Sequence, residues 1–317
     1  MNKDSKIYIA GHRGMVGSAI WRALDAQGYS NLIGKPSKDL DLRNQKAVSD
    51  FISKEKPDII IDAAAKVGGI LANSKYQFEF LIENMQIQNN LIDAAHKSNV
   101  EKFVFLGSSC IYPKLAPQPL KESYLLTGPL EPTNDGYAIA KISGVRLCKA
   151  LRDQYNKDFV SLMPTNLYGP HDNFELQSSH VLPAMIRKFH EAKSNNNAPV
   201  TLWGTGSPMR EFLHVDDLAK AVIYAVENDL PEHLYNVGTG IDVTIKDLAK
   251  IVQETVGHKG EIVWDDSKPD GTPRKLMDVS KMNALGWKAE IELSKGTQST
   301  YEWFLANENT LKKNKIK

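Results

Sequence analysis

Short apolar segments alternate with longer segments of helical spacing through the first half of the chain. The apolar segments are rich in β-branched and aromatic residues and cover residues 6–10, 59–63, 102–106 and 159–163. Helical spacing of apolar residues fills the intervals, most clearly at 18–26, 80–98 and 137–155. Strands that alternate with helices form a parallel sheet covered on both faces. The sequence therefore predicts an α/β fold with a Rossmann-type, doubly wound parallel sheet.

This rhythm changes after Pro164, where prolines and an Asn-rich run interrupt it. We expect a Rossmann domain over residues 1–169, with 215–237 packing back on it and 215–228 forming one more helix. A smaller α/β C-terminal lobe for the substrate is predicted from 170–214 and 238–317. Within that lobe, helical spacing marks 245–256 and 293–306.

Composition limits the partners of the chain. A formal net charge of +1 over 317 residues gives no general attraction to nucleic acid or to an anionic membrane. No window of about 18 apolar residues is present to span a bilayer, and the apolar run near the N-terminus is shorter than that of a signal peptide. Cys110 and Cys148 form no disulfide framework. These features predict a cytoplasmic protein that acts on small molecules, without nucleic acid, membrane or metal.

A glycine-rich loop follows the first predicted strand and opens the first predicted helix. Its glycines allow a tight turn and a close approach to a pyrophosphate, and the start of the helix attracts that anion. A glycine-rich turn without a ligand is the alternative. The loop residues expected at the dinucleotide are Gly11, His12, Arg13, Gly14, Met15, Val16 and Gly17.

The segment Asn31-Leu32-Ile33-Gly34 would end the second strand of the Rossmann fold. The residues that follow it indicate which dinucleotide is bound. An enzyme that uses NAD places a carboxylate there, about 20 residues after the glycines, to hold the ribose 2′-hydroxyl. This chain has Lys35 and Lys38 instead, and Arg13 inside the glycine loop. The three cations favour a 2′-phosphate and therefore NADP(H), whereas two merely solvated lysines are the alternative. Asp41 and Leu42 follow at a position suited to the adenine.

Three further residues predict hydride-transfer chemistry. Tyr137 and Lys141 are spaced i, i+4 at the start of a predicted helix, so that both side chains lie on one face. A phenol with a reference pKa near 10 gains acidity when an ammonium stabilises its anion. Ser108 follows the strand 102–106, where open parallel sheets bind their ligands, and its hydroxyl can hold a carbonyl oxygen.

Two more groups suggest a second reaction. Cys110 lies close to Ser108, and His180 precedes an apolar stretch further along. Thiol and imidazole exchange protons near neutrality, and a plain ketone reductase needs neither of them. A buried core cysteine and a surface histidine are the alternatives. Together with the triad, the pair indicates an enzyme that inverts stereocentres and reduces a ketone.

The motifs together resemble a known family. They are the glycine loop 11–17, Ala63-Ala64-Ala65-Lys66-Val67-Gly68-Gly69-Ile70, Gly107-Ser108-Ser109-Cys110-Ile111-Tyr112-Pro113, Tyr137-Ala138-Ile139-Ala140-Lys141, and Pro164-Thr165-Asn166-Leu167-Tyr168-Gly169-Pro170. The chain resembles the extended short-chain dehydrogenases/reductases, and among them the GDP-L-fucose synthases. The resemblance implies epimerisation of GDP-4-keto-6-deoxy-D-mannose at C3 and C5 by Cys110 and His180. Reduction at C4 by NADPH then follows, with Tyr137, Ser108 and Lys141 as the catalytic residues.

The same resemblance implies further contacts. To the cofactor it assigns Ala64, Leu106, Gly107, Ser108, Lys141, Pro164, Thr165, Asn166, Leu167 and His180, and to the GDP-sugar Lys188, Trp203, Arg210 and Asp278. It also implies a homodimer joined through the helix after Gly136 and a neighbouring helix. Two alternatives stay open. One is another nucleotide-sugar epimerase or dehydratase of the same fold, and the other is a non-catalytic NADP-binding regulator.

Overall fold

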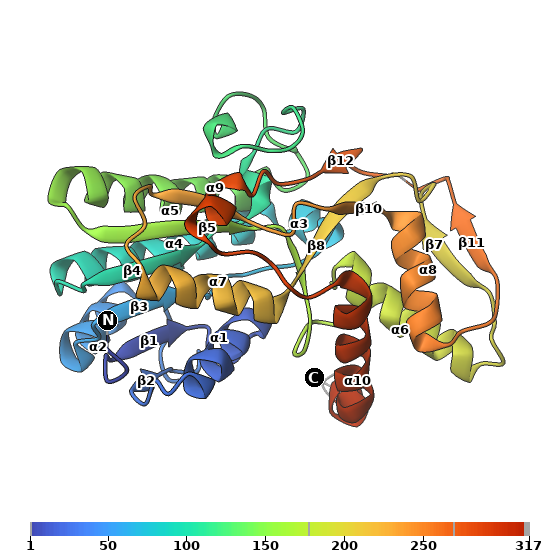
Figure 1. The fold of residues 1–317 in the computed structure, drawn as a ribbon, viewed down its shortest axis with the longest axis horizontal. Coiled ribbons are helices and arrows are strands. Elements are labelled where there is room, and N and C mark those ends of the chain that lie inside the picture. Colours follow the sequence, from blue (N-terminus) through green and yellow to red (C-terminus); the bar gives the residue numbers. More distant parts are fainter. Residues whose placement is uncertain (1, 177, 269, 314–317) are drawn as a thin grey trace.

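Six parallel strands form the central sheet of the computed structural model, which describes residues 2–176, 178–268 and 270–313. Their order across the sheet is β2-β1-β3-β4-β5-β9 (Figure 1). The strands are β1 (Ile7–Ala10), β2 (Leu32–Ile33), β3 (Ile59–Asp62), β4 (Lys102–Leu106), β5 (Asp158–Pro164) and β9 (Leu234–Val237). The predicted α/β class with a parallel, Rossmann-like sheet is confirmed.

Helices cover both faces of this sheet because its strands are apolar on both sides. Ile7 and Ile9 of β1 face a core shared with α1 (Met15–Ala26) and α7 (Val215–Glu227). Tyr8 and Ala10 face the opposite core, shared with α2 (Gln45–Glu55), α4 (Gln77–Lys97) and α5 (Asp135–Tyr155). Full burial of one such isoleucine contributes about 1.5–3 kcal/mol. The predicted return of the helix near 215–228 to the sheet is confirmed by the position of α7.

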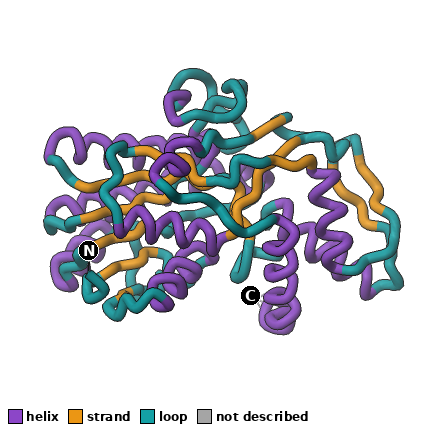
Figure 2. Tube along the Cα trace, in the orientation of Figure 1, coloured by secondary structure: helices purple, strands orange, loops and turns teal. Residues whose placement is uncertain are grey.

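The C-terminal half builds a smaller lobe with its own core. A four-stranded sheet contains β10 (Asp242–Thr244), β8 (Met209–His214) and β12 (Arg274–Lys275), with β6 (Asn166–Tyr168) also pairing with β8. Next to it lie β7 (Val200–Trp203) and β11 (Ile262–Asp265). The helices are α6 (Val181–Ser194), α8 (Ile245–Val256) and α10 (Leu293–Lys313). The helices predicted at 245–256 and 293–306 are confirmed, and α10 continues further (Figure 2).

Four short elements pack against the large-sheet part: η1 (Ser109–Ile111), η2 (Glu122–Tyr124), α3 (Ile70–Lys75) and α9 (Ser280–Leu285). Met277 and Val279 pack in one core of the large sheet, and Met282 and Trp287 pack in the other. This part of the chain therefore returns from the lobe to the first domain. The exact domain boundaries stay a prediction.

Parallel strands bring their carboxyl ends to one edge of the sheet, and this edge carries the predicted motifs. The glycine loop follows β1, Ala64 follows β3, Gly107 and Ser108 follow β4, and Thr165 follows β5. From β5 the chain passes through β6 directly into the lobe. Among the described helices, none is long and apolar enough to cross a membrane.

Candidate active site

The glycine loop folds into a tight cradle at the start of α1. Gly11 has φ +77°, and a Cβ there would stand 2.8 Å from the carbonyl oxygen of Ala63. A Cβ on Gly17 would stand 2.2 Å from the carbonyl oxygen of Gly11, so the helix needs glycine to pack this closely. No side chain caps the N-terminus of α1 at Gly14. Its first N–H groups are therefore free to bind an anion, and the cradle fits the pyrophosphate of a dinucleotide.

The three cations predicted to bind a 2′-phosphate lie in two loops that contact each other. The imidazole of His12 lies against Gly34, which brings the loop after β2 beside the glycine loop. Their neighbours Arg13 and Lys35 flank this contact, and Lys38 follows in the same loop. All three cations are exposed, and none forms an ion pair with a residue that the structure describes.

Asp41 and Leu42, predicted near the adenine, end the same loop. Hydrogen bonds from Arg43 hold the pKa of the exposed Asp41 carboxyl below its usual value, with a closest N–O separation of 2.9 Å. Leu42 is half-buried and packs against the core under α2 and α4. The structure thus brings both residues to the edge where the second strand ends, and their contact with adenine stays a prediction.

Other residues predicted to contact the cofactor line the same edge. The amide of Gly107 donates to the carbonyl of Leu162 at 2.9 Å, which fixes the turn after β4. Thr165 Oγ1 and Asn166 Nδ2 donate to the Glu211 carbonyl at 3.3 and 2.7 Å. The turn after β5 is therefore fixed to β8 of the lobe. Ala64, Leu106, Gly107, Ser108, Pro164, Thr165, Asn166 and Leu167 all lie at the ends of β3, β4 and β5.

Tyr137 and Lys141 lie in the first two turns of α5, against the end of β4. Lys141 is 2 % exposed, and its Nζ donates to the Leu106 carbonyl at 2.8 Å. The same Nζ lies 4.7 Å from the centre of the Phe105 ring and 5.9 Å from that of the Tyr137 ring. Burial lowers the pKa of Lys141, while Asp62 and Cys110 oppose that effect.

The pKa of Tyr137 differs from the prediction that a nearby ammonium makes its phenol more acidic. Burial raises the pKa of its phenol, and the charges of Cys110 and Asp62 raise it further. The hydrogen bond of Lys141 goes to the Leu106 carbonyl in this structure. Tyr137 is therefore a neutral phenol, which is the form that donates a proton.

Cys110 lies in η1, directly after Ser108. Ser108 begins this turn, and its Oγ accepts the Cys110 amide at 3.4 Å. The thiol is 7 % exposed, and burial raises its pKa, whereas Lys275 and then Ser108 act in the opposite direction. Cys110 and Lys275 line one hollow, together with Ser109, Tyr112, Pro113, Lys114, Gln118, Leu120, Glu131, Asn134, Thr272 and Arg274.

His180 begins α6, and a glycine-rich run holds it beside the first domain. The amide of Gly69 donates to the Ser178 carbonyl at 3.0 Å, so the 66–70 run lies next to the segment that ends at His180. Desolvation and, second, the charge of Lys275 lower the pKa of His180, although the ring keeps exposed surface. The charge of Lys275 therefore acts on both Cys110 and His180. Lys275 also lines the hollow of Cys110, and a shared space for the thiol and the imidazole stays a prediction.

Three of the predicted substrate contacts lie on α6, β7 and β8 of the lobe. Lys188 of α6 donates to the Thr201 carbonyl of β7 at 3.0 Å. Trp203 ends β7 with 53 % of its surface exposed. Arg210 of β8 pairs in register with Lys275 of β12, and burial lowers its pKa. The exposed indole of Trp203 suits a nucleotide base, and the cations of Lys188 and Arg210 suit a diphosphate.

Asp270 is an acidic residue near Arg210 that the sequence analysis did not predict. Its oxygens accept the amide and the hydroxyl of Thr205 at 2.7 and 2.8 Å, and its charge acts on Arg210. Asp278, the predicted sugar contact, accepts the Ser280 amide at 2.9 Å, and hydrogen bonds from the Ser280 side chain and then from this amide lower its pKa. Asp278 also lies near the buried Glu122, and its charge raises the pKa of that group. Its contact with the sugar stays a prediction.

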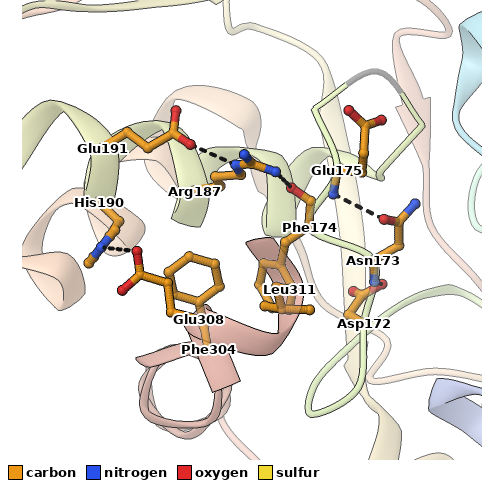
Figure 3. A pocket seen from close by; sticks show the side chains of 10 residues that line it. All are labelled: Asp172, Asn173, Phe174, Glu175, Arg187, His190, Glu191, Phe304, Glu308 and Leu311. Carbon is orange, nitrogen blue, oxygen red and sulfur yellow. Dashed lines mark hydrogen bonds and ion pairs between the residues drawn. The ribbon is translucent and has the colours of Figure 1, made fainter. Parts of the chain in front are cut away.

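A second hollow lies within the lobe, away from these residues (Figure 3). Arg187 of α6 donates to Glu191 at 2.7 Å and to the Phe174 carbonyl at 3.1 Å. His190 lies 3.5 Å from Glu308 of α10. The polar groups drawn here bond largely with one another, which indicates a structural role in attaching α10.

Comparisons with known proteins identify the family of this chain. Residues 7–238 match the family model described as the NAD dependent epimerase/dehydratase family. The chain is 55% identical to GDP-L-fucose synthase 1 of Arabidopsis thaliana, with 96% of this chain and 95% of the relative covered. It is 54% identical to GDP-L-fucose synthase of Escherichia coli K12, with 96% and 98% covered. A GDP-L-fucose synthetase structure from Naegleria fowleri bound to NADP is 28% identical with a TM-score of 0.90, over 98% of this chain and 95% of that one. This chain belongs to the NAD dependent epimerase/dehydratase family, in the GDP-L-fucose synthase branch.

Proposed function

We propose that the protein converts GDP-4-keto-6-deoxy-D-mannose to GDP-L-fucose with NADPH, by epimerisation at C3 and C5 and then reduction at C4. Two observations support this proposal: Cys110 and Lys275 line one hollow, and the 66–70 run is hydrogen-bonded to the segment that ends at His180. A thiol and an imidazole around one space, next to the phenol of Tyr137, supply proton carriers for both reactions. The names of the relatives support the same assignment.

The epimerisation uses the acidity that the C4 ketone gives to the hydrogens on C3 and C5. Inversion requires one group to remove a proton and another to return one to the opposite face. Cys110 reaches the space from η1, and His180 reaches it from the start of α6. The two groups come from different elements of the chain, and in this proposal they act on opposite faces of the bound sugar. Lys275 adds a positive charge near the enolate that forms.

NADPH, bound in the glycine cradle, supplies the hydride for C4. The chain must then hold the carbonyl oxygen and give it a proton. Tyr137 is neutral because burial raises its pKa, and it is therefore able to donate. The Ser108 hydroxyl holds the oxygen by a hydrogen bond. Lys141, bonded to Leu106, supplies a nearby positive charge for the tyrosinate that remains.

Incubation of the purified protein with NADPH and GDP-4-keto-6-deoxy-D-mannose tests the proposal. The expected product is GDP-L-fucose, identified by mass and by the proton couplings of its sugar ring. Another epimerase or dehydratase of this fold would leave NADPH unconsumed. A non-catalytic regulator would bind NADPH and return the sugar unchanged, and either result would exclude the proposed function.

The three loop cations predict a preference for NADPH. We expect NADPH to bind at least about tenfold more tightly than NADH, the scale of one charge-assisted hydrogen bond. Titration of cofactor fluorescence measures both constants. Lys35→Ala and Lys38→Ala should weaken NADPH binding and leave NADH binding unchanged. Lys97→Ala is the matched control, because Lys97 lies at the far end of α4 and pairs with Asp93. Equal affinities in the unmodified protein would contradict the cofactor assignment.

The predicted homodimer and cytoplasmic location belong to the same proposal. Helices α4 and α5 pack side by side on one face of the large sheet and leave apolar side chains in solvent. Phe78 of α4 is 72% exposed, and Ile139 and Leu147 of α5 are 45% and 37% exposed. A second copy of the chain would bury this surface. Cys110 and Cys148 are both free and buried, which suits a reducing cytoplasm.

A charged residue on this face tests the dimer. Leu147→Glu is expected to shift the protein from dimer to monomer, because a carboxylate would otherwise be buried between the two copies. Sedimentation velocity measures the mass. Leu305→Glu is the control, since Leu305 is 46% exposed on α10 in the other lobe. A dimer that persists in Leu147→Glu would exclude this face as the interface.

A further inference from the structure

Asp62 is a buried carboxyl group that the proposed mechanism does not use. It ends β3 within an otherwise apolar strand, and none of its surface is exposed. Its Oδ1 accepts the Ala64 amide at 3.2 Å. Its Oδ2 has no hydrogen-bond partner among the described residues. Burial of a carboxylate is costly unless a charge compensates it, so the surroundings of Asp62 are informative.

The strand register places Asp62 next to the site of Lys141. Asp62 pairs with Phe105 of β4, whose ring lies 4.7 Å from Lys141 Nζ. That Nζ also bonds to the carbonyl of Leu106, the next residue of β4. Since side chains alternate along a strand, Asp62 lies on the same face as Ile60, which is the face covered by α5.

Lys141 is the cation that faces Asp62 in this core. The other titratable groups here are Tyr8 from β1, Cys110 from η1, and Tyr137 and Cys148 from α5. Burial raises the pKa of each of these four groups, so they are neutral around pH 7. Lys141 is therefore the basic group whose charge acts on the buried carboxyl beneath the reacting centre.

We propose that Asp62 is the counter-ion of Lys141 and a positioning residue for the reduction step. This inference rests on the proposed function, because it assigns Lys141 to the reduction. Asp62 acts through Lys141, whose ammonium must stay charged and in place beside Tyr137 although it is buried.

The titration behaviour of the two groups supports this role. Burial raises the pKa of Asp62 to about 6, and Lys141 is the main opposing charge. Burial lowers the pKa of Lys141, and Asp62 is the main group that opposes it. Each group therefore favours the charged form of the other. Without the carboxylate, the ammonium would lose its proton at a lower pH.

The pH dependence of reduction in Asp62→Asn tests the inference. The rate of single-turnover NADPH oxidation is expected to fall at alkaline pH about one unit earlier than in the unmodified protein, the scale of one neighbouring opposite charge. Deuterium exchange at C3 and C5, measured without NADPH, should be unchanged at pH 7. Asp172→Asn is the matched control, since Asp172 is also a buried carboxyl, with its pKa raised to about 7, in the region between the lobe's β6 and α6. It should alter neither measurement.

The outcomes separate this inference from the proposed function. If the unmodified protein forms no GDP-L-fucose, the proposed function fails. If it forms the product and the pH profile of Asp62→Asn superimposes on that of the unmodified protein, the counter-ion role is excluded. Equal loss of reduction and exchange with an unmoved pH profile would show a merely structural role, and it would also overturn the proposal. Asp62→Leu repeats the test without the amide, and thermal melting verifies that both variants fold.

Discussion

Cys110→Ser is expected to lose deuterium exchange into C3 and C5 by about 10²- to 10⁴-fold, the contribution of a positioned acid or base. A serine hydroxyl fills the same space but exchanges protons poorly near neutrality. Exchange is followed by mass spectrometry of the GDP-4-keto sugar in heavy water. NADPH binding should remain near normal, because the glycine cradle lies at the end of β1 and not in η1.

A matched variant is available at the other thiol. Cys148 is fully buried in α5, and burial raises its pKa to about 12. Cys148→Ala should therefore keep full isotope exchange, apart from a modest loss of stability from the smaller side chain. Undiminished exchange in Cys110→Ser would remove Cys110 from the mechanism and would leave an ordinary reductase.

The motifs that sequence alone could identify are local. The glycine loop is local, and so is the i, i+4 spacing of Tyr137 and Lys141. The joint position of all motifs follows from the parallel sheet, because the carboxyl ends of its strands share one edge. The sequence could therefore predict that the cofactor-binding loops and the residues Ser108, Tyr137 and Lys141 lie at the same edge of the sheet.

The residues that were missed reach the site through strand pairing. Lys275 comes beside Arg210 because β12 pairs with β8, and it lines the hollow of Cys110; Asp270 precedes the same strand. Asp62 comes beside Lys141 because β3 pairs with β4. Register between distant strands is not visible in one sequence. The one local signal for Asp62 was a charged residue inside an apolar strand.

Helix α6 was missed for a different reason. Pro183 interrupts the apolar pattern after His180, and prolines were read as the end of regular structure. In the structure Pro183 is the third residue of α6, within its first turn. Proline is tolerated there because the amide that it lacks would have no partner within the helix. The helix places His180 at its N-terminus, whereas the sequence shows only that His180 precedes an apolar stretch.

Tyr137→Phe is expected to lower the rate of NADPH oxidation by about 10²- to 10⁴-fold, since it removes the proton donor to the C4 oxygen. The ring itself should stay in place, because its edge contact with Phe80, at 6.3 Å between ring centres, needs no hydroxyl. Deuterium exchange at C3 and C5 should continue, because Cys110 and His180 remain. The epimerised ketone should then accumulate, and this separates the two reactions within one protein.

The control for this substitution lies on the same helix. Tyr155 ends α5 with 56% of its surface exposed, so Tyr155→Phe should leave both rates unchanged. Reduction at an unchanged rate in Tyr137→Phe would show that another group protonates C4. If the two Phe variants lost reduction equally, the loss would reflect the helix and not the phenol. Loss of reduction with continued exchange in Tyr137→Phe, and loss of exchange in Cys110→Ser, together assign one reaction to each side chain.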